Sequence, residues 1–269
     1  MKAKIYTIEG QQTGELDLPE QFDEEIREDI IKRAVLSVQS NRIKPEGVNP
    51  FAGRRYSSYI SKRRRKYRGI YGRGESRTPR KVMSRSGTQF HFVGAYVPQT
   101  VGGRKAHPPS AEKIHAKKIN KKEKQKAIRS AIAATANIGL VKARGHKTEI
   151  APIIIEDKFE LITKTKDVEK ALRSMKLDNE LDRARIKKIR AGRGKLRGRP
   201  YKKKKGPLIV VSKNCALTNS AKNIPGINVI SVKDLNAEAL APGASPGRLT
   251  IYTKSAIDTM QKERLFMRK

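Results

Sequence analysis

Short apolar runs alternate with stretches of helical period along most of this chain. Runs of strand length lie at 5–8, 152–155, 208–211, 227–230 and 248–252. Around them, apolar residues recur every three or four positions at 26–38, 127–135 and 168–175, and short helices are expected at 235–240 and 256–262. Short strands that alternate with amphipathic helices are typical of a sheet buried on both faces. The pattern therefore predicts an α/β fold with a largely parallel sheet and helices on both faces.

Local signals indicate where individual helices begin. Asp23, followed by two glutamates, is a candidate N-cap for the first helix. Asn120 and Glu123 have the spacing of a capping box, and the small residues that follow predict a second helix that packs closely against its neighbours. A basic helix is expected at about 181–189.

The apolar pattern breaks down in two places, where the charge also changes. Residues 45–110 carry 15 Lys and Arg against two acids, and residues 183–205 carry 13 against none. By contrast, residues 1–44 hold seven basic and nine acidic side chains, and residues 148–182 hold six and nine. We therefore expect 1–44 and 111–269 to form a globular α/β domain. Residues 45–110 would be an extended basic arm inserted in it, and 183–205 a second basic segment within the domain.

Both basic segments are expected to depend on a polyanion for their order. Arg-rich, Gly-rich sequence cannot bury enough apolar surface to offset the entropy lost on ordering. The whole chain has a formal net charge of +35 and only 36% hydrophobic residues. Such a charge repels itself unless a polyanion screens it, and nucleic acid is the polyanion that these segments fit best. We expect the arm to lack regular structure until RNA orders it.

Membrane and secreted classes fit the sequence poorly. No run approaches the roughly 20 apolar residues of a spanning helix, and the N-terminal residues turn acidic before an apolar core of signal-peptide length appears. Cys215 is the only cysteine, so a disulfide within the chain is impossible. We expect a cytoplasmic protein without a membrane partner.

The basic segments combine cations, glycines and aromatic rings in a way that suits RNA. Arginine binds phosphate in a fork, glycine lets the backbone approach it, and unpaired bases stack on rings. For Tyr56, Tyr59, Tyr67 and Tyr71, base stacking and packing within the arm are equally supported. The candidate rRNA-binding residues are Arg54, Arg55, Lys62, Arg63, Arg64, Arg65, Lys66, Arg68, Arg73, Arg77, Arg80, Lys81, Arg85, Arg104, Lys105, His107, Arg190, Arg193, Lys195, Arg197, Arg199, Lys202 and Lys203.

Other chemistries find little support. The Gly-Arg-Gly triplets at 72–74 and 192–194 lack the spacing of a dinucleotide loop and the ending of a phosphate-binding loop. His91, His107, His115 and His146 form no zinc spacing with the single cysteine. For a histidine in the basic arm, a plain surface role is favoured over base stacking or phosphate binding, and both of these are favoured over metal ligation. No nucleophile elbow occurs, and the strand-end acids at 156 and 157 are expected to be solvated. The sequence predicts no catalytic residue, metal or cofactor, and hence no enzyme.

Several long stretches resemble the archaeal-type family of large-subunit ribosomal protein four, the universal ribosomal protein family four. They are GELDLP at 14–19, GGRKAHPP at 102–109, KAIRSAIAAT at 126–135, KIRAGRGKLRGR at 188–199 and LAPGASPGRLT at 240–250. The resemblance implies a globular domain on the large ribosomal subunit and an arm that threads rRNA to help line the nascent-peptide exit tunnel near its constriction. It implies large-subunit rRNA and neighbouring ribosomal proteins, including protein twenty-two of that subunit, as partners, with no self-oligomer. Near the tip of the arm it places Gly72, Arg73, Gly74, Arg77, Arg80 and Arg85.

Two other classes remain open on charge and fold alone. A DNA- or chromatin-binding architectural protein would tolerate the same net charge, but the sequence has no helix-turn-helix or dimer signature. An RNA-modifying enzyme on a doubly wound sheet would need a pocket at the strand ends. Binding to folded rRNA against duplex DNA at matched salt separates the first class, and stabilisation by a cofactor would reveal the second.

Overall fold

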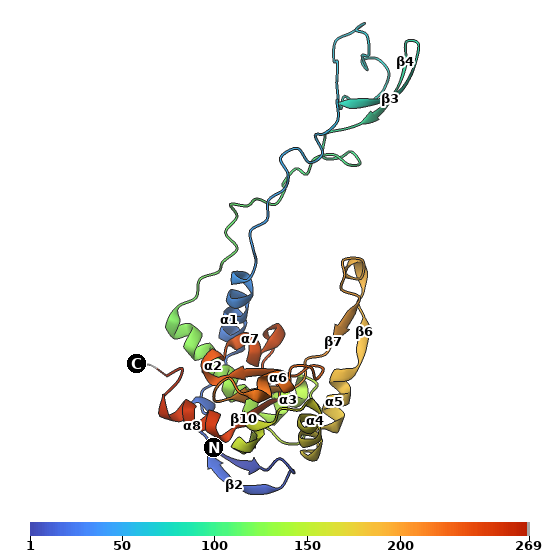
Figure 1. Ribbon diagram of the computed structural model, residues 1–269. Coiled ribbons are helices and arrows are strands. Elements are labelled where there is room, and N and C mark those ends of the chain that lie inside the picture. Colours follow the sequence, from blue (N-terminus) through green and yellow to red (C-terminus); the bar gives the residue numbers. More distant parts are fainter. Residues whose placement is uncertain (268–269) are drawn as a thin grey trace. The chain divides into compact units, whose positions relative to one another are not determined.

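The computed structural model describes residues 1–267, and its contacts divide the chain into two units (Figure 1). One unit comprises residues 1–42 and 116–269, and the other comprises residues 43–115. We call the first the sheet unit and the second the inserted unit.

The sheet unit is built on six strands in the order β2-β1-β5-β10-β8-β9. The strands are β1 (Lys2–Tyr6), β2 (Gln12–Asp17), β5 (Ile153–Ile155), β8 (Leu208–Val211), β9 (Asn228–Ser231) and β10 (Thr250–Thr253). All neighbouring pairs are parallel except β1 and β2, which form an antiparallel hairpin at one edge. The predicted α/β fold with a largely parallel sheet is confirmed.

Helices cover both faces of this sheet. Successive strand residues point to opposite sides, so each buried strand presents apolar side chains to both layers of helices. Ile154 packs into a core that includes side chains of α1 (Glu28–Asn41), α2 (Lys121–Ala136), α7 (Ala237–Leu240) and α8 (Lys254–Lys262). Its neighbours Ile153 and Ile155 pack into a second core. That core includes side chains of α3 (Ile138–Ala143), α4 (Thr165–Ser174), α5 (Asp178–Arg185) and α6 (Ala216–Ser220).

Two helix starts are capped differently from the sequence prediction. Asp23 does not cap α1: it ends a short 3-10 turn (Glu20–Phe22), and Arg27 occupies the N-cap position. The Arg27 backbone N–H donates to Ser130 Oγ of α2 at 2.7 Å, so this start is fixed by a residue 103 positions away. Asn120 does precede α2, but its side chain makes no capping hydrogen bond, so the capping-box prediction is wrong.

The predicted basic helix at 181–189 is also wrong in its second half. Helix α5 ends at Arg185, and the chain continues as strand β6 (Lys187–Ile189), which pairs antiparallel with β7 (Tyr201–Lys203). Figure 1 shows this hairpin leaving the end of α5. A 3-10 turn (Gly192–Gly194) lies in the loop between the two strands.

The inserted unit contains a β-hairpin that the sequence reading did not foresee. Strands β3 (Arg80–Ser86) and β4 (Gln89–Gly94) pair antiparallel, with an irregularity in register between Val82 and Ser84. The expectation that residues 45–110 lack regular structure is therefore wrong for this part. Ile70 and Ala95 are the buried hydrophobic residues of the unit, so its apolar interior is small.

One buried cation joins three strands at their N-terminal ends. Arg248, which precedes β10, is only 2% exposed. Its guanidinium donates to the Gly206 carbonyl at 3.0 Å, the Ala239 carbonyl at 2.8 Å and Asn228 Oδ1 at 2.8 Å. Burial, and secondarily the charge of Arg144, lowers the pKa of Arg248 to about 10. The fork geometry of arginine satisfies several oxygens at once, which a single ammonium cannot do.

We predict that Arg248→Met lowers the free energy of unfolding by about 3 kcal/mol, because it leaves buried carbonyls without donors. Arg248→Lys should fall between this variant and the wild type. Urea unfolding followed by circular dichroism measures the loss, and a methionine variant as stable as the wild type would contradict this role of Arg248.

Candidate nucleic-acid interface

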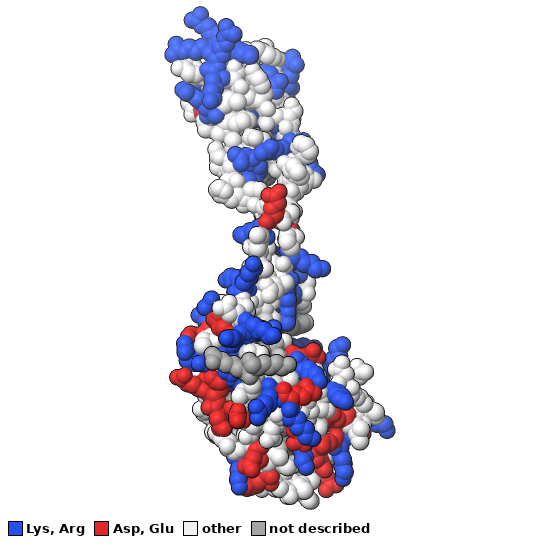
Figure 2. Space-filling model, turned by 90° about the vertical axis from the view of Figure 1, so that its left-hand side faces the viewer, with Lys and Arg blue, Asp and Glu red and all other residues white. Residues whose placement is uncertain are grey.

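Most of the predicted RNA-binding side chains are exposed. The exceptions are half-buried: Arg68, Arg80, Lys81, Arg104 and Arg190. In Figure 2 one end of the inserted unit is densely covered by Lys and Arg, whereas the visible face of the sheet unit carries both signs. The exposed cations are therefore available to an external anion in both basic segments.

An aromatic cluster gives the inserted unit its internal structure. The rings of Phe90 and Phe92 on β4 are stacked with centroids 5.6 Å apart, and Tyr67 meets Phe90 edge-on at 5.3 Å. The guanidinium groups of Arg68 and Arg85 lie 5.4 and 5.7 Å from the Phe90 centroid. Such pairs contribute roughly 0.5–1.5 kcal/mol each beyond area burial. Rings and cations thus support each other where few aliphatic residues are present.

The other predicted stacking tyrosines also carry cations over their rings. Lys81 Nζ lies 4.1 Å from the Tyr56 centroid, and Lys66 Nζ lies 5.5 Å from that of Tyr59. Tyr71 has Arg64 at 4.9 Å and Arg77 at 5.1 Å. All four tyrosines remain exposed. Packing within the unit and exposure to a base are therefore combined in the same rings.

Two arginines assigned to the tip are held by their own neighbours. Arg80 donates to the Ser76 carbonyl at 2.6 Å and lies 3.6 Å from a Glu75 carboxylate oxygen. Arg85 donates through Nε to the Gly87 carbonyl at 2.9 Å. Arg73 and Arg77 are exposed. Of the predicted tip arginines, Arg80 is thus half-buried, whereas Arg85 has a partner in the loop but is exposed, as are Arg73 and Arg77.

Glycine is required where two stretches of the inserted unit run against each other. A Cβ on Gly53 would lie 2.4 Å from the Arg104 amide nitrogen of the other stretch. Gly103 instead allows a tight turn within its own stretch, where a Cβ would lie 2.0 Å from the Val97 carbonyl oxygen. Gly53 also has a φ of +76°, a conformation that side chains disfavour. Residues near 53 and 104 thus form a neck, at which two stretches of the inserted unit pass close to each other.

The second basic segment is the β6–β7 hairpin and its loop. Arg190 braces it: Nε donates to the Arg199 carbonyl at 3.2 Å and an Nη donates to the Tyr201 carbonyl at 3.3 Å. The other predicted cations are exposed: Arg193, Lys195, Arg197, Arg199, Lys202 and Lys203. Arg190 thus stabilises the loop that presents them.

A buried ion cluster fixes the base of this hairpin to the sheet unit. His146 Nδ1 lies 2.7 Å from Glu180 Oε1, and Arg183 donates to the other carboxylate oxygen at 2.7 Å. An Nη of Arg183 also donates to the carbonyl of Lys205, just after β7. His146 is only 4% exposed. Burial alone would raise the pKa of Glu180, but the hydrogen bonds from His146, Arg183 and the Lys147 amide lower it to about 2.

A third basic surface was not predicted from the sequence. Residues 117–126 contain six lysines and a single acid, Glu123. Lys117 and Lys118 line a surface hollow with Lys32 and Arg33 of α1. A charge count over the start of α2 would find this cluster, whereas the sequence analysis used these residues only for the capping-box spacing of Asn120 and Glu123.

The strand ends where open α/β sheets commonly bind ligands are closed by the chain itself. A 3-10 turn (Asp157–Leu161) carries Glu160, whose carboxylate accepts from Ser212 N at 2.9 Å and Thr253 Oγ1 at 2.6 Å. Asp157 accepts from the Ser255 N–H and Glu156 from the Ile8 N–H, so these strand-end acids have structural partners. The groups that a substrate would meet at this edge are already engaged.

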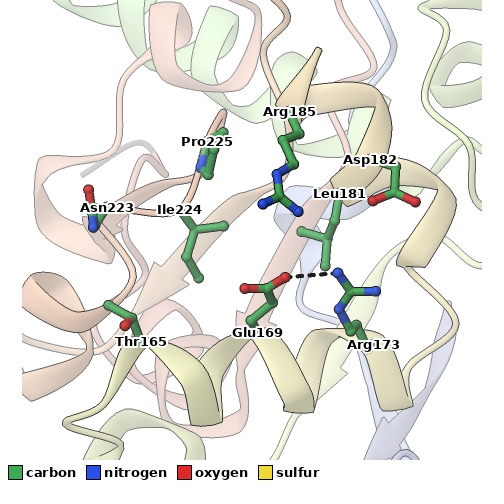
Figure 3. Close-up of a pocket in the computed structure, with 9 residues that line it drawn as sticks. All are labelled: Thr165, Glu169, Arg173, Leu181, Asp182, Arg185, Asn223, Ile224 and Pro225. Atoms are coloured by element: carbon green, nitrogen blue, oxygen red, sulfur yellow. Dashed lines mark hydrogen bonds and ion pairs between the residues drawn. The ribbon is translucent and has the colours of Figure 1, made fainter.

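The surface pocket in Figure 3 lies between α4, α5 and the loop at 223–225. An ion pair of 2.8 Å joins Glu169 to Arg173, and Asp182 and Arg185 add one charge of each sign. The lining residues include neither histidine nor cysteine. One of the two acids in the pocket, Glu169, is thus already paired with an arginine of the same helix.

Residues 1–267 contain neither a candidate metal site nor a candidate membrane span. No group of three or more His, Cys, Asp or Glu side chains is arranged to hold a metal ion. Within the same residues, no helix combines the length and apolarity needed to cross a membrane.

We predict that Glu180→Gln lowers the free energy of unfolding by about 2 kcal/mol near neutral pH, because charge-assisted hydrogen bonds are lost. The pKa of Glu180 is depressed in the folded chain, so its contribution is complete above pH 4.5 and disappears as the pH falls toward 2. Urea unfolding at about pH 7 and about pH 3 should therefore show a smaller difference in acid.

Glu169→Gln is the matched control, since Glu169 forms an exposed ion pair on the neighbouring helix. It should change stability by less than about 0.5 kcal/mol at either pH. Equal effects of the two substitutions would contradict the role assigned to the buried cluster.

Comparison with known proteins places the chain in a family. The model of the ribosomal protein L4/L1 family matches residues 16–263. A "Large ribosomal subunit protein uL4" from Nanoarchaeum equitans is 48% identical over 99% of this chain and 100% of its own length. Proteins of the same name from Archaeoglobus fulgidus and Methanosphaera stadtmanae are 47% and 45% identical, over 96% and 98% of this chain and 97% and 99% of theirs. The chain belongs to the ribosomal protein L4/L1 family.

Proposed function

We propose that this protein is a structural, non-enzymatic constituent of the large ribosomal subunit in the cytoplasm, where it binds large-subunit rRNA. The observation that carries the proposal is the separation of charge along the chain. Residues 45–110 hold 15 cations and two acids, and residues 183–205 hold 13 cations and no acid. The sheet, by contrast, is packed by apolar side chains on both faces. The full-length relatives carry the name of a large-subunit protein.

Binding would rest on phosphate neutralisation by exposed cations of the inserted unit and the β6–β7 hairpin. Arg63, Arg64 and Arg65 lie together and exposed, as do Arg197 and Arg199 in the second segment. Contacts of this kind set register and affinity, whereas shape and unpaired bases supply specificity. The sheet unit contributes the folded core, because both faces of its sheet are packed by apolar side chains.

Within this function, residues 45–110 form an extended arm that threads rRNA and helps line the nascent-peptide exit tunnel near its constriction. Neighbouring ribosomal proteins, including large-subunit protein twenty-two, contact it there. Gly72 and Gly74 have positive φ angles, and a Cβ on either would meet nothing within 4 Å. An open turn with Arg73 and Arg77 exposed beside it suits a tip that fits between RNA and other proteins.

Deletion of residues 55–100, joined by a short Gly-Ser linker, tests the role of the arm. We predict that the sheet unit stays folded, because the two cores contain no residue of the deleted segment and the chain ends meet at the neck. Affinity for large-subunit rRNA should fall and its salt dependence weaken, since twelve Lys and Arg are removed. Each lost phosphate contact reduces the log–log salt slope by about 0.7 to 0.9.

A full-length chain with residues 62–66 changed to glutamine is the matched control, since it removes five charges and no backbone. Its slope should lie between those of the wild type and the deletion. Circular dichroism that shows global unfolding of the deletion, or slopes equal to that of the wild type, would contradict the proposal. Tighter binding to duplex DNA than to rRNA at matched salt would favour an architectural DNA-binding protein instead.

A further inference from the structure

The β6–β7 hairpin exposes apolar side chains that the phosphate-binding role does not explain. Ile189 is 73% exposed and Tyr201 is 55% exposed, although both belong to strands. Burial of either against a partner would remove unfavourable apolar surface from water. Neither residue belongs to the two hydrophobic cores of the sheet unit.

Register places these two side chains on one face of the hairpin. Ile189 is paired directly with Tyr201, so their side chains lie on the same side. Lys187 is paired with Lys203 two positions further along, which puts both lysines on that face as well. Lys188 and Lys202 form the pair between them and point to the opposite face. One face is thus apolar and aromatic with a lysine pair beside it, and the other is purely basic.

Two other residues of the hairpin, Lys187 and Arg190, help to hold the Tyr201 ring in position. Lys187 Nζ lies 5.9 Å from the ring centroid, near the outer limit of a cation–π contact. Arg190 donates to the Tyr201 carbonyl and fixes the backbone at this residue. The ring is therefore held in place while more than half of its surface stays open to solvent.

The positive charge around Tyr201 and Ile189 indicates which kind of partner binds this face of the hairpin. Residues 183–205 contain 13 cations and no acid, so a neighbouring protein surface would have to be both acidic and apolar. Single-stranded RNA presents both groups in each nucleotide: a flat base that stacks on an aromatic ring and a phosphate that pairs with lysine. Duplex RNA would offer the phosphates without a free base.

We propose that Tyr201 and Ile189 form a stacking site for one unpaired base of large-subunit rRNA, with Lys187 and Lys203 holding the adjacent phosphates. The proposal rests on the rRNA-binding function above and assigns a specific contact to it. The site distinguishes single-stranded from duplex RNA, which the purely basic face of Lys188 and Lys202 does not.

Two measurements on the full-length chain test the site. In the first, large-subunit rRNA transcribed with 4-thiouridine is bound to the wild-type protein, irradiated and digested, and the cross-linked peptides are identified by mass spectrometry. A cross-link on 187–203 that includes Tyr201 is expected, and it requires no substitution. In the second, binding is titrated over a range of salt concentrations for a set of variants.

Tyr201→Ala should weaken binding to the rRNA by about tenfold without changing the salt slope, because stacking releases no counterion. Tyr201→Phe should bind within about twofold of the wild type, since it keeps the ring. Lys187→Ala and Lys203→Ala should each reduce the slope by about 0.7. Unchanged circular dichroism of each variant excludes misfolding as the cause.

The outcomes separate this site from the function on which it rests. A wild-type chain without salt-dependent rRNA binding would overturn both. Normal wild-type binding with no cross-link at Tyr201 and no loss in Tyr201→Ala would overturn the stacking site alone. A cross-link from Tyr201 only to another ribosomal protein, observed in intact subunits, would overturn it as well.

Discussion

Electrostatic repulsion among the cations is the constraint to which the rest of the structure responds. The chain carries 61 Lys and Arg against 26 acids, and no folded core tolerates such an excess without counter-charge. The sheet unit meets the constraint by keeping its two cores almost wholly apolar. Of the few charges that it buries, Arg248 is surrounded by carbonyl oxygens and Glu180 by His146 and Arg183. The unmatched cations are left in segments that face solvent.

Each of these segments is nevertheless shaped before any RNA binds. The inserted unit uses rings and guanidinium groups in place of aliphatic packing, as at Phe90, and a glycine neck where Gly53 meets Arg104. The hairpin is fixed at its base by Arg183 and in its loop by Arg190. Pre-shaping lowers the entropy lost when a partner binds, so cations and rings meet RNA in defined positions. Disorder alone is therefore not what these basic sequences encode.

Features that depend on a local sequence pattern could be predicted, whereas features that depend on contacts between distant residues could not. Leu208–Val211 was recognisable because a strand buried on both faces is a continuous apolar run. Strand β2 was missed because Gln12–Asp17 is a mostly polar edge strand held by backbone pairing to β1. The end of α5 was misplaced because Lys187–Ile189 shows no strand pattern of apolar and polar residues. These residues form a strand only because they pair with β7. The candidate cations were visible as charge blocks, but the pairing of Tyr201 with Ile189 and of His146 with Glu180 depends on distant residues.

The central claim is that the two basic segments, held by an α/β body, are where this chain meets ribosomal RNA. Ultraviolet cross-linking of native large subunits, followed by mass spectrometry of the RNA-linked peptides, tests it most directly. The account predicts that most linked peptides from this chain come from residues 43–115 and 186–205. RNA links confined to α4 and α5, with none in either basic segment, would contradict it.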